Sequence, residues 1–356
     1  MPVLFHSQLK IIMTPLLGKT LAELQDITTA LGMPTFAAKQ IAQWLYVKRA
    51  RTIDEMTNLS KDNRARLVAA GYAIGYEDPV DAARSKDGTI RYLFATPVGK
   101  HIETVYLPEH ERATLCISSQ IGCKMHCYFC MTGKQGFNGQ LTSHQIINQI
   151  FAIPESLTLT NLVFMGMGEP LDNWEELRKA LDIITAPWGM AWSPKRVTVS
   201  TIGQMQHLTD FLNESHCNLA VSIHSPFADE RLKLMPVQGA YPISEVISLL
   251  KTYDWTHQRE LTFEYIVFRG VNDDKRHAQE LLRLLKSLPC KVNLIRFHAI
   301  PDVDLQTSDI NAMESFRDYL CQHGLMTTIR ASRGEDIYAA CGMLSSKKEE
   351  ERRIKE

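Results

Sequence analysis

Residues 112–136 read RATLCISSQIGCKMHCYFCMTGKQG and contain four of the eight cysteines of the chain. Three of its cysteines, Cys123, Cys127 and Cys130, have the spacing Cys-x3-Cys-x2-Cys. Thiolates are the ligands that iron–sulfur clusters take, so three of them this close in sequence can hold one cluster. A fourth cysteine in ferredoxin fashion is missing, which leaves one iron open to another ligand. The alternative is a structural zinc site, which needs four ligands and would have to recruit His126.

The totals of the sequence are those of an ordinary globular protein. The chain has 356 residues, of which 45% are hydrophobic and 22% charged, and this length suits one large domain of barrel size plus a small one. It has neither an apolar run long enough to span a membrane nor a signal-peptide pattern. We therefore expect a cytoplasmic protein, whose eight cysteines are ligands, catalytic groups or core residues rather than disulfides.

Residues 1–80 are expected to form a small helical domain. A capping box begins at Thr20, and helices are predicted over about 20–31 and 36–48 and from Ser60 onward. Between residues 39 and 66 seven basic residues stand against three acidic ones. The basic residues are Lys39, Lys48, Arg49, Arg51, Lys61, Arg64 and Arg66. Such a module can bind phosphates, although a solvated helix face explains it equally well. The net charge of −1 means that any RNA contact must be local.

Residues 81–111 predict a β-hairpin extension. Within it, residues 88–108 alternate apolar and polar side chains on both sides of Pro97-Val98-Gly99. Glu103 lies in the second strand of this hairpin, and the sequence alone gives its carboxylate no special role. At the end of the chain, residues 345–356 are charged without periodic apolar residues, so a frayed tail is expected there.

From residue 112 to residue 344, short strands alternate with helical patterns, which predicts βα units and a parallel sheet. Strands are expected near 113–118, 160–166, 196–201, 218–224, 261–268 and 291–297, with 327–331 as a candidate seventh. Helices are expected near 142–152, 173–186, 203–213, 243–253, 273–287 and 309–323. Six repeats are fewer than the eight of a full barrel, and ligands in such sheets bind at the carboxyl ends of the strands.

Several motifs fall at those strand ends. Gly168-Glu169 follows the second strand, where a glycine lets the backbone approach a ligand closely, although a plain turn would look the same. Ser200 and the segment 222–224 end the next two strands, and Asn293 lies in the sixth. The histidine of that segment, His224, taken alone is more often structural than a ligand.

The remaining cysteines are typical of small core residues when each is taken singly. They are Cys116, Cys217, Cys290, Cys321 and Cys341. Glycines and charged residues around Cys341 indicate a mobile exposed loop, where a core residue is less expected.

The cysteine spacing resembles that of the radical S-adenosylmethionine enzymes. The longer segments SSQIGC at 118–123 and CMTGKQGF at 130–137 resemble the RlmN/Cfr family of RNA adenosine methyltransferases. Within that family the chain is more similar to the carbon-2 branch, RlmN. The sequences of residues 37–41 and 54–60 are similar to those of the N-terminal accessory domain of that family. The resemblance implies a partial, open (β/α)6 barrel over 112–344.

The same resemblance implies two cofactors, a 4Fe–4S cluster on Cys123, Cys127 and Cys130 and S-adenosylmethionine. The S-adenosylmethionine-binding positions of the family correspond here to Gly168, Glu169, Ser200, Ser222, Ile223, His224 and Asn293. The chain departs from the sequence pattern of the family after Asn293. Residues 296–301 read RFHAIP, where the family has a Pro-Trp/Tyr-Asn type of segment.

For catalysis, the resemblance implies a methylated cysteine as the carrier of the transferred carbon. Cys341 would carry a methyl group from one S-adenosylmethionine, and a radical made from a second one would remove a hydrogen from it. The resulting methylene would add to carbon 2 of the adenine, and Glu103 would take the ring proton as a general base. Cys116 would then release the RNA by forming a disulfide with Cys341.

The implied substrate is an adenosine of 23S rRNA at the peptidyl-transferase centre, and the adenosine 3′ to the tRNA anticodon stays open as a second substrate. An electron donor such as a flavodoxin is implied, and we expect a monomer without membrane contact. Three alternatives remain. Methylation at adenine carbon 8 would use the same cysteines, a radical activase or maturase would act on protein, and a cluster-binding regulator would need neither Gly168-Glu169 nor the serines.

Overall fold

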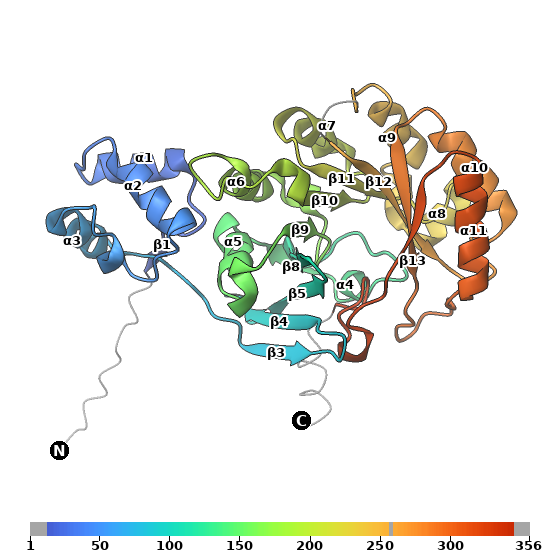
Figure 1. The fold of residues 1–356 in the computed structure, drawn as a ribbon, viewed down its shortest axis with the longest axis horizontal. Coiled ribbons are helices and arrows are strands. Elements are labelled where there is room, and N and C mark those ends of the chain that lie inside the picture. Colours follow the sequence, from blue (N-terminus) through green and yellow to red (C-terminus); the bar gives the residue numbers. More distant parts are fainter. Residues whose placement is uncertain (1–12, 256–258, 345–356) are drawn as a thin grey trace, which may run out of the picture.

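The computed structural model describes residues 13–255 and 259–344. Figure 1 shows a large α/β core, with the N-terminal helices at one end and an extended segment joining the two. The tail predicted at 345–356 lies outside the described residues. In the described part of the chain, no helix has the length and apolar character needed to cross a bilayer.

One mixed sheet dominates the core, with the strand order β14-β13-β12-β11-β10-β9-β6-β5-β4-β3 in the described residues. Strands β6 and β9 to β14 run parallel to one another. Their bounds are Arg112–Cys116 (β6), Asn161–Phe164 (β9), Val197–Thr201 (β10), Asn218–Ser222 (β11), Leu261–Val267 (β12), Cys290–Arg296 (β13) and Thr327–Arg330 (β14). The predicted partial barrel is thus confirmed, with the candidate seventh strand included.

Helices follow most of these strands, as the periodicity predicted. Their bounds are Ser143–Phe151 (α5), Trp174–Thr185 (α6), Met205–Glu214 (α7), Ile243–Leu250 (α9), Lys275–Leu285 (α10) and Ile310–Gln322 (α11). Local capping fixes several of their starts: Thr142 and Gln145 form a capping box before α5, and Asp274 caps α10. Two short helices were not predicted, α4 (Met131–Lys134) and α8 (Ala228–Leu234).

The β-hairpin is formed by β4 (Ile90–Ala95) and β5 (His101–Glu109), which pair antiparallel. Strand β3 (Asp81–Arg84) extends it on one side, and β5 pairs with β6 on the other. The hairpin therefore continues the main sheet rather than standing apart from it. A separate ladder joins β7 (Gln120–Gly122) to β8 (Phe137–Gln140) around the three-cysteine loop.

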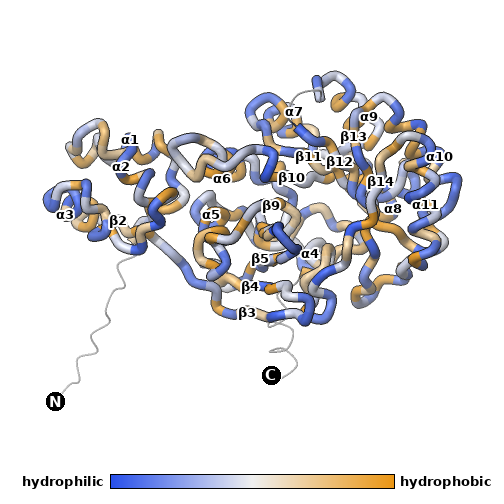
Figure 2. The backbone as a smooth tube through the Cα atoms, in the orientation of Figure 1, coloured by the Kyte–Doolittle hydropathy of each residue, from blue (hydrophilic) through white to orange (hydrophobic). Residues whose placement is uncertain are grey.

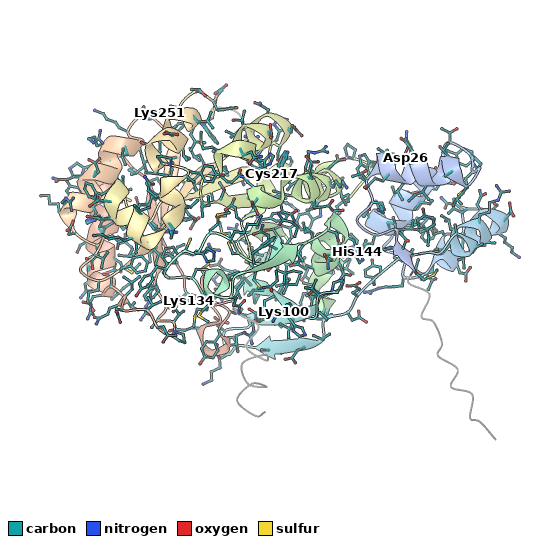
Figure 3. All side chains as sticks on the ribbon, turned by 180° about the vertical axis from the view of Figure 1, so that it is seen from behind. Asp26, Lys100, Lys134, His144, Cys217 and Lys251 are labelled. Carbon is teal, nitrogen blue, oxygen red and sulfur yellow. The ribbon has the colours of Figure 1, made fainter. Side chains whose placement is uncertain are left out.

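The N-terminal helices are α1 (Leu21–Ala30), α2 (Ala37–Ala42) with a π-helical turn over Gln43–Val47, and α3 (Lys61–Ala69). The predicted capping box of Thr20 and Glu23 is present. A short parallel pair, β1 (Thr14–Pro15) and β2 (Tyr72–Ala73), ties the two ends of this region together. Hydrophobic and hydrophilic residues alternate along these helices in Figure 2, as expected for helices with one buried face. In Figure 3, Asp26 on α1 and Lys251 lie at opposite ends of the molecule.

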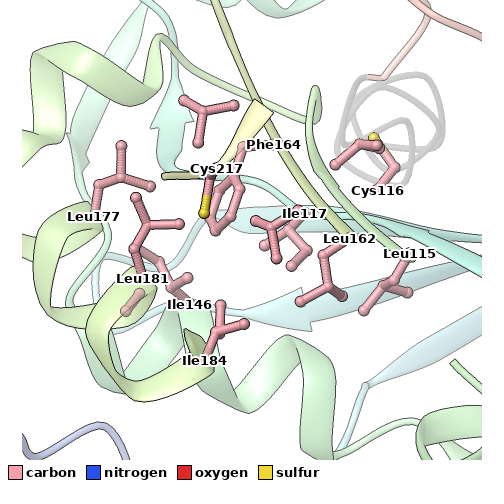
Figure 4. Close-up of a cluster of buried hydrophobic side chains, with 14 of the residues drawn as sticks. Leu115, Cys116, Ile117, Ile146, Leu162, Phe164, Leu177, Leu181, Ile184 and Cys217 are labelled. Atoms are coloured by element: carbon pink, nitrogen blue, oxygen red, sulfur yellow. The ribbon is translucent and has the colours of Figure 1, made fainter. Parts of the chain in front are cut away.

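Side-chain alternation along the parallel strands separates the packing face from the inner face. Leu115 and Ile117 are fully buried, and Figure 4 shows them with Leu162 among side chains from α5 and α6. Cys116, between them, points to the other side of the strand. Because successive side chains of a strand face opposite ways, the residues in register with Cys116 face the interior of the open barrel.

Candidate active site

Backbone hydrogen bonds hold the three-cysteine loop in place. The Cys123 N–H donates to the Gly136 carbonyl at 3.0 Å, and the Tyr128 N–H donates to the Leu234 carbonyl at 2.9 Å. Gly122 has φ of 78°, and a Cβ there would lie 1.8 Å from the Gly136 carbonyl oxygen. The loop can therefore cross its partner strand this closely only with glycine at 122.

Cys127 and Cys130 pack in an apolar environment made by Phe129, Met235 and Phe268, among others. Burial raises the pKa of the Cys127 thiol well above its ordinary value. As a thiolate, Cys130 raises the pKa of both Cys127 and Cys123, and Cys123 also raises that of Cys127. His126, the alternative fourth ligand, is exposed at a positive φ of 50°. Three partly buried thiols thus lie near one another without that imidazole.

Gly168 and Glu169 follow β9, as predicted. Gly168 has φ of 104°, and a Cβ there would lie 2.5 Å from the Gln120 Cβ. The buried Glu169 carboxylate accepts hydrogen bonds from Thr201 Oγ1 (2.6 Å), the Ile202 N–H (3.0 Å) and the Leu171 N–H (3.2 Å). Burial raises the pKa of Glu169 to about 7. A carboxylate has about four acceptor positions, so one remains for a cation or donor outside this set.

The predicted serines and Asn293 lie on the inner face at two levels. Ser222 is in register with Glu264, Glu264 with Asn293, and Asn293 with Thr328. Ser200 is one level lower, in register with Ala220. The Asn293 amide is oriented on both sides, because its Nδ2 donates to Glu264 Oε1 (3.0 Å) and its Oδ1 accepts from Thr328 Oγ1 (2.6 Å).

His224 and Ile223 differ in what they offer to a ligand. The Ile223 side chain is fully buried in the main core, so only its backbone can reach a bound molecule. His224 is 4% exposed, and its Nδ1 accepts from the Ile266 N–H at 3.0 Å. Burial lowers the pKa of His224 to about 3. The imidazole is therefore neutral, with its proton on Nε2, and its ring meets the edge of Phe129 at 4.9 Å between centroids.

Cys116 and Cys341, far apart in the sequence, line one cavity of about 580 Å³ together with Asn293 and Glu264. The segment carrying Cys341 is attached to the three-cysteine region, because the Met131 N–H donates to the Gly342 carbonyl (2.8 Å). Thr132 Oγ1 also donates to the Leu344 carbonyl (3.0 Å). Cys341 packs against the same apolar cluster as Cys127 and Cys130.

Glu103 is 1% exposed on β5, and its Oε1 lies 3.2 Å from Arg91 Nη1. Val105 and Leu107, further along the same strand, line the cavity that holds the two cysteines. Glu103 itself is not among the described residues that line this cavity. The structure thus places Glu103 on the neighbouring part of β5, paired with Arg91.

Comparison with known proteins identifies the family. Residues 117–284 match the model of the radical SAM superfamily, and residues 14–71 match that of the ribosomal RNA large subunit methyltransferase N-terminal domain. A protein of Bacteroides fragilis named "Probable dual-specificity RNA methyltransferase RlmN" is 60% identical over 95% of this chain and 98% of its own length. The chain belongs to the RlmN family of radical S-adenosylmethionine RNA methyltransferases.

More distant RlmN relatives agree with this assignment. The dual-specificity RNA methyltransferase RlmN of Marinobacter nauticus is 40% identical over 95% of this chain and 94% of its own length. The crystal structure of a radical SAM methyltransferase from Sphaerobacter thermophilus covers 93% of this chain and 98% of its own, with 39% identity and a TM-score of 0.86. The open barrel and the N-terminal helices are therefore shared across nearly the full length.

The family's cofactors are a 4Fe–4S cluster and S-adenosylmethionine, and the donor set of this RlmN chain fits them. Three thiols lie in an apolar site, and their mutual repulsion as thiolates is what a cationic metal centre removes. Among the described residues, no group of three or more His, Cys, Asp or Glu is arranged to hold one metal ion. In a cluster, by contrast, each thiolate binds its own iron, and the three-cysteine pattern leaves one iron open.

Three functional candidates were not predicted from the sequence. Arg231 is fully buried beside Cys127 and donates to the carbonyls of Ile202 (2.9 Å) and Ser222 (3.2 Å) at the strand ends. Glu264 and Arg330 line the cavity with Cys116 and Cys341. A charged residue inside the otherwise apolar stretch LTFEYIV at 261–267 was the available signal for Glu264. A basic residue in a short unpredicted helix carried no such signal for Arg231.

The three cysteines assigned to the core differ from one another. Cys217 is 1% exposed and lies within the packed cluster of Figure 4, as predicted. Cys290 is partly buried at the edge of the main core. The prediction for Cys321 is wrong, because this residue is exposed and its thiol donates to the Thr327 carbonyl at 3.4 Å. The last turn of α11 leaves Cys321 on its outer face.

Proposed function

We propose that this protein methylates carbon 2 of an adenosine in 23S rRNA at the peptidyl-transferase centre. The adenosine 3′ to the tRNA anticodon is its second substrate, in keeping with the dual specificity in the names of its relatives. The observation that carries the proposal is the meeting of Cys116 and Cys341 in one cavity beside the three-cysteine loop. The protein works in the cytoplasm as a monomer and receives electrons from a donor such as a flavodoxin.

The cofactor-holding residues divide between the cysteine loop and the strand ends. Cys123, Cys127 and Cys130 would hold three irons of the cluster, and Gly168-Glu169 would receive the ammonium of S-adenosylmethionine on the remaining acceptor position of Glu169. The nucleoside and carboxylate would contact Ser200, Ser222, Ile223, His224 and Asn293. Together these cofactors supply a carbon radical that removes a hydrogen atom, which a protein side chain alone cannot do.

The two cysteines in the cavity have separate roles: Cys341 carries the transferred carbon, and Cys116 releases the methylated RNA. Cys341 carries the methyl group into the cavity, and the activated carbon on its sulfur bonds to the base. Cys116 then attacks the Cys341 sulfur and frees the methylated RNA. Glu103 is the base that takes the ring proton, and since a base must come within hydrogen-bond reach of that proton, the adenine has to approach β5. Arg91 holds the Glu103 carboxylate in place until then.

One measurement tests the carrier directly, the mass of the Cys341 peptide from protein purified without oxygen. A methyl group on Cys341 is expected, and an unmodified Cys341 in active protein would contradict the proposal. The product nucleoside, separated by chromatography, distinguishes 2-methyladenosine from the 8-methyladenosine of the alternative.

Two cysteine variants separate the carrier from the release step. With Cys341→Ala there is no sulfur to carry the carbon, so no RNA–protein adduct forms. With Cys116→Ala the adduct forms but nothing releases it, so an RNase-sensitive heavier band accumulates on a denaturing gel. Cys217→Ala is the control and should turn over normally. Adduct from both variants, or from neither, would refute the assigned roles.

We assign RNA binding to the N-terminal helices. Two of the predicted basic residues already have partners within the protein. Arg49 Nη1 donates to Ser156 Oγ (2.5 Å), and Arg66 pairs with Asp62 (2.7 Å). Lys39, Lys48 and Lys61 are exposed and better placed to reach phosphates. Changing these three lysines to Gln should lower the slope of log K against log salt by about 0.7 to 0.9 for each lost phosphate contact. Lys251→Gln, at the opposite end in Figure 3, is the control and should leave the slope unchanged.

A further inference from the structure

Arg330 occupies a place in the cavity to which the proposed chemistry gives no role. It lies on the inner face of β14, in register with Ile295. Its Nη1 is 3.2 Å from Met165 Sδ and 4.0 Å from Glu264 Oε2. Cys116 and Cys341 line the same cavity. One guanidinium therefore stands among sulfur-bearing side chains and a buried carboxylate.

The attacking thiol needs such a cation. The thiolate, not the thiol, is the nucleophile, yet burial, together with the neighbouring Cys341, raises the pKa of Cys116 to about 12. Arg330 acts on Cys116 in the opposite direction, and so does the Met165 N–H that faces its sulfur. Met165 therefore contacts both residues. Its backbone N–H faces the Cys116 sulfur, and its Sδ lies next to the Arg330 guanidinium.

We propose that Arg330 is a positioning residue that stabilises the Cys116 thiolate as it forms and turns it toward Cys341, and so sets the rate of adduct release. This inference rests on the proposed function and deepens it. In the step concerned, the Cys116 sulfur bonds to the Cys341 sulfur, and the bond from Cys341 sulfur to the methylene carbon breaks. The electron pair of that bond goes to the carbon, which takes a proton and becomes the methyl group. The two sulfurs are oxidised to a disulfide while the carbon is reduced, so no outside reagent is needed.

Glu264 completes the arrangement. Its Oε1 accepts from Asn293, whereas its buried Oε2 has no hydrogen-bond donor among the described residues. Oε2 is directed at Arg330 from 4.0 Å, a distance at which a charge attracts the guanidinium without a fixed hydrogen bond. Glu264 therefore keeps Arg330 on the inner face without engaging the guanidinium in a fixed hydrogen bond.

The experiment is a single turnover with anaerobic, cofactor-loaded protein and an RNA hairpin, quenched at intervals and analysed for covalent adduct and product. Arg330→Gln should form the adduct but release it about ten- to a hundredfold more slowly, because losing a nearby opposite charge raises a pKa by about one to two units. Arg330→Lys keeps the charge and should recover most of the rate. Arg178→Gln, the same change on the exposed face of α6, should release at the normal rate.

Rescue by Arg330→Lys separates this role from a merely structural one, and a pH series shows that release depends on a thiolate. Raising the pH from 7 to 9 should speed release by a similar factor in Arg330→Gln and in the unchanged protein, because the pKa of the Cys116 thiol lies above this range in both. Cys341, Glu264 and Glu109 are the other titratable groups acting at this place. Release at the normal rate in Arg330→Gln, or a block before adduct formation, would overturn the proposal.

A second measurement is independent of turnover. In protein prepared so that Cys341 is an unmethylated thiol, formation of the Cys116–Cys341 disulfide on treatment with glutathione disulfide depends on thiolate, and it should slow by the same factor in Arg330→Gln. An equal rate in both proteins would overturn the role of Arg330. An unmethylated Cys341 in active protein purified without oxygen would instead refute the proposed function, so the two failures are distinguishable.

Discussion

Two cysteine-bearing loops meet at the same edge of the sheet, yet they are held there by different means. The Cys123–Cys130 loop is enclosed by its own ladder, β7 with β8, whose strands are only a few residues away in sequence. The segment 331–344, with Cys341, has only one short helical turn, Glu335–Ile337. It is held by distant partners, including the Gly334 N–H donating to Asp87 Oδ2 (2.9 Å) and the Gly342 carbonyl accepting from Met131. One loop is built to be rigid, and the other is tethered at its ends.

This difference suits the proposed roles. A cluster needs ligands that do not move, whereas in the proposed function Cys341 would meet a methyl donor, an RNA base and Cys116 in turn. Tethers at Gly334 and Gly342 restrict the path of Cys341 without enclosing it, because the bonds fix backbone positions on both sides of the cysteine. The comparison predicts large effects from changes in the first loop and smaller, graded effects from changes in the second.

The largest effect is expected from the ligands themselves. Cys127→Ala should abolish cluster binding, because two thiolates in an apolar site cannot hold it, and iron and sulfide analysis measures the loss. Cys321→Ala, at an exposed position, should keep its full iron content. If Cys127→Ala also keeps full iron and sulfide, the ligand assignment is wrong.

A matched pair of glycines compares the two loops directly. Both have positive φ, 78° at Gly122 and 82° at Gly342, but their surroundings differ. A Cβ at 122 would lie 1.8 Å from a backbone oxygen, and one at 342 would lie 3.4 Å from the nearest atom. Gly122→Ala should cost more than about 4 kcal/mol, and Gly342→Ala only the conformational penalty of about 1–2 kcal/mol. Denaturant unfolding measures both, and equal costs would contradict the contrast.

The same contrast explains which parts were predictable. The Cys-x3-Cys-x2-Cys spacing and Gly168-Glu169 are local patterns, and the alternation of predicted strands and helices placed Ser200 and Ser222 at strand ends. The docking of Cys341 depends on partners more than 200 residues away, and no local pattern encodes such a contact. Arg330 and Arg231 look like surface residues in a sequence, because only the assembled sheet shows that Arg330 faces the cavity and that Arg231 is buried.

The smallest effect is expected from the tether at Asp87. Its carboxylate accepts from the N–H groups of Gly334 and Thr89, both at 2.9 Å, and these bonds lower its pKa from 3.8 to about 2. A depressed pKa means that the tether is complete above about pH 4 and is lost only as the pH falls through 2. Asp87→Asn removes the charge at every pH.

At pH 7, Asp87→Asn should therefore speed tryptic cleavage after Arg333 about fivefold, the factor that corresponds to roughly 1 kcal/mol of lost anchoring. The iron content should not change, because the cysteine loop shares no bond with Asp87 among the described contacts. Asp26→Asn, on the exposed face of α1 at the far end of the molecule, is the matched control and should leave cleavage unaltered. Faster cleavage together with loss of iron would show that the two loops unfold as one unit, and the distinction between a rigid loop and a tethered one would fail.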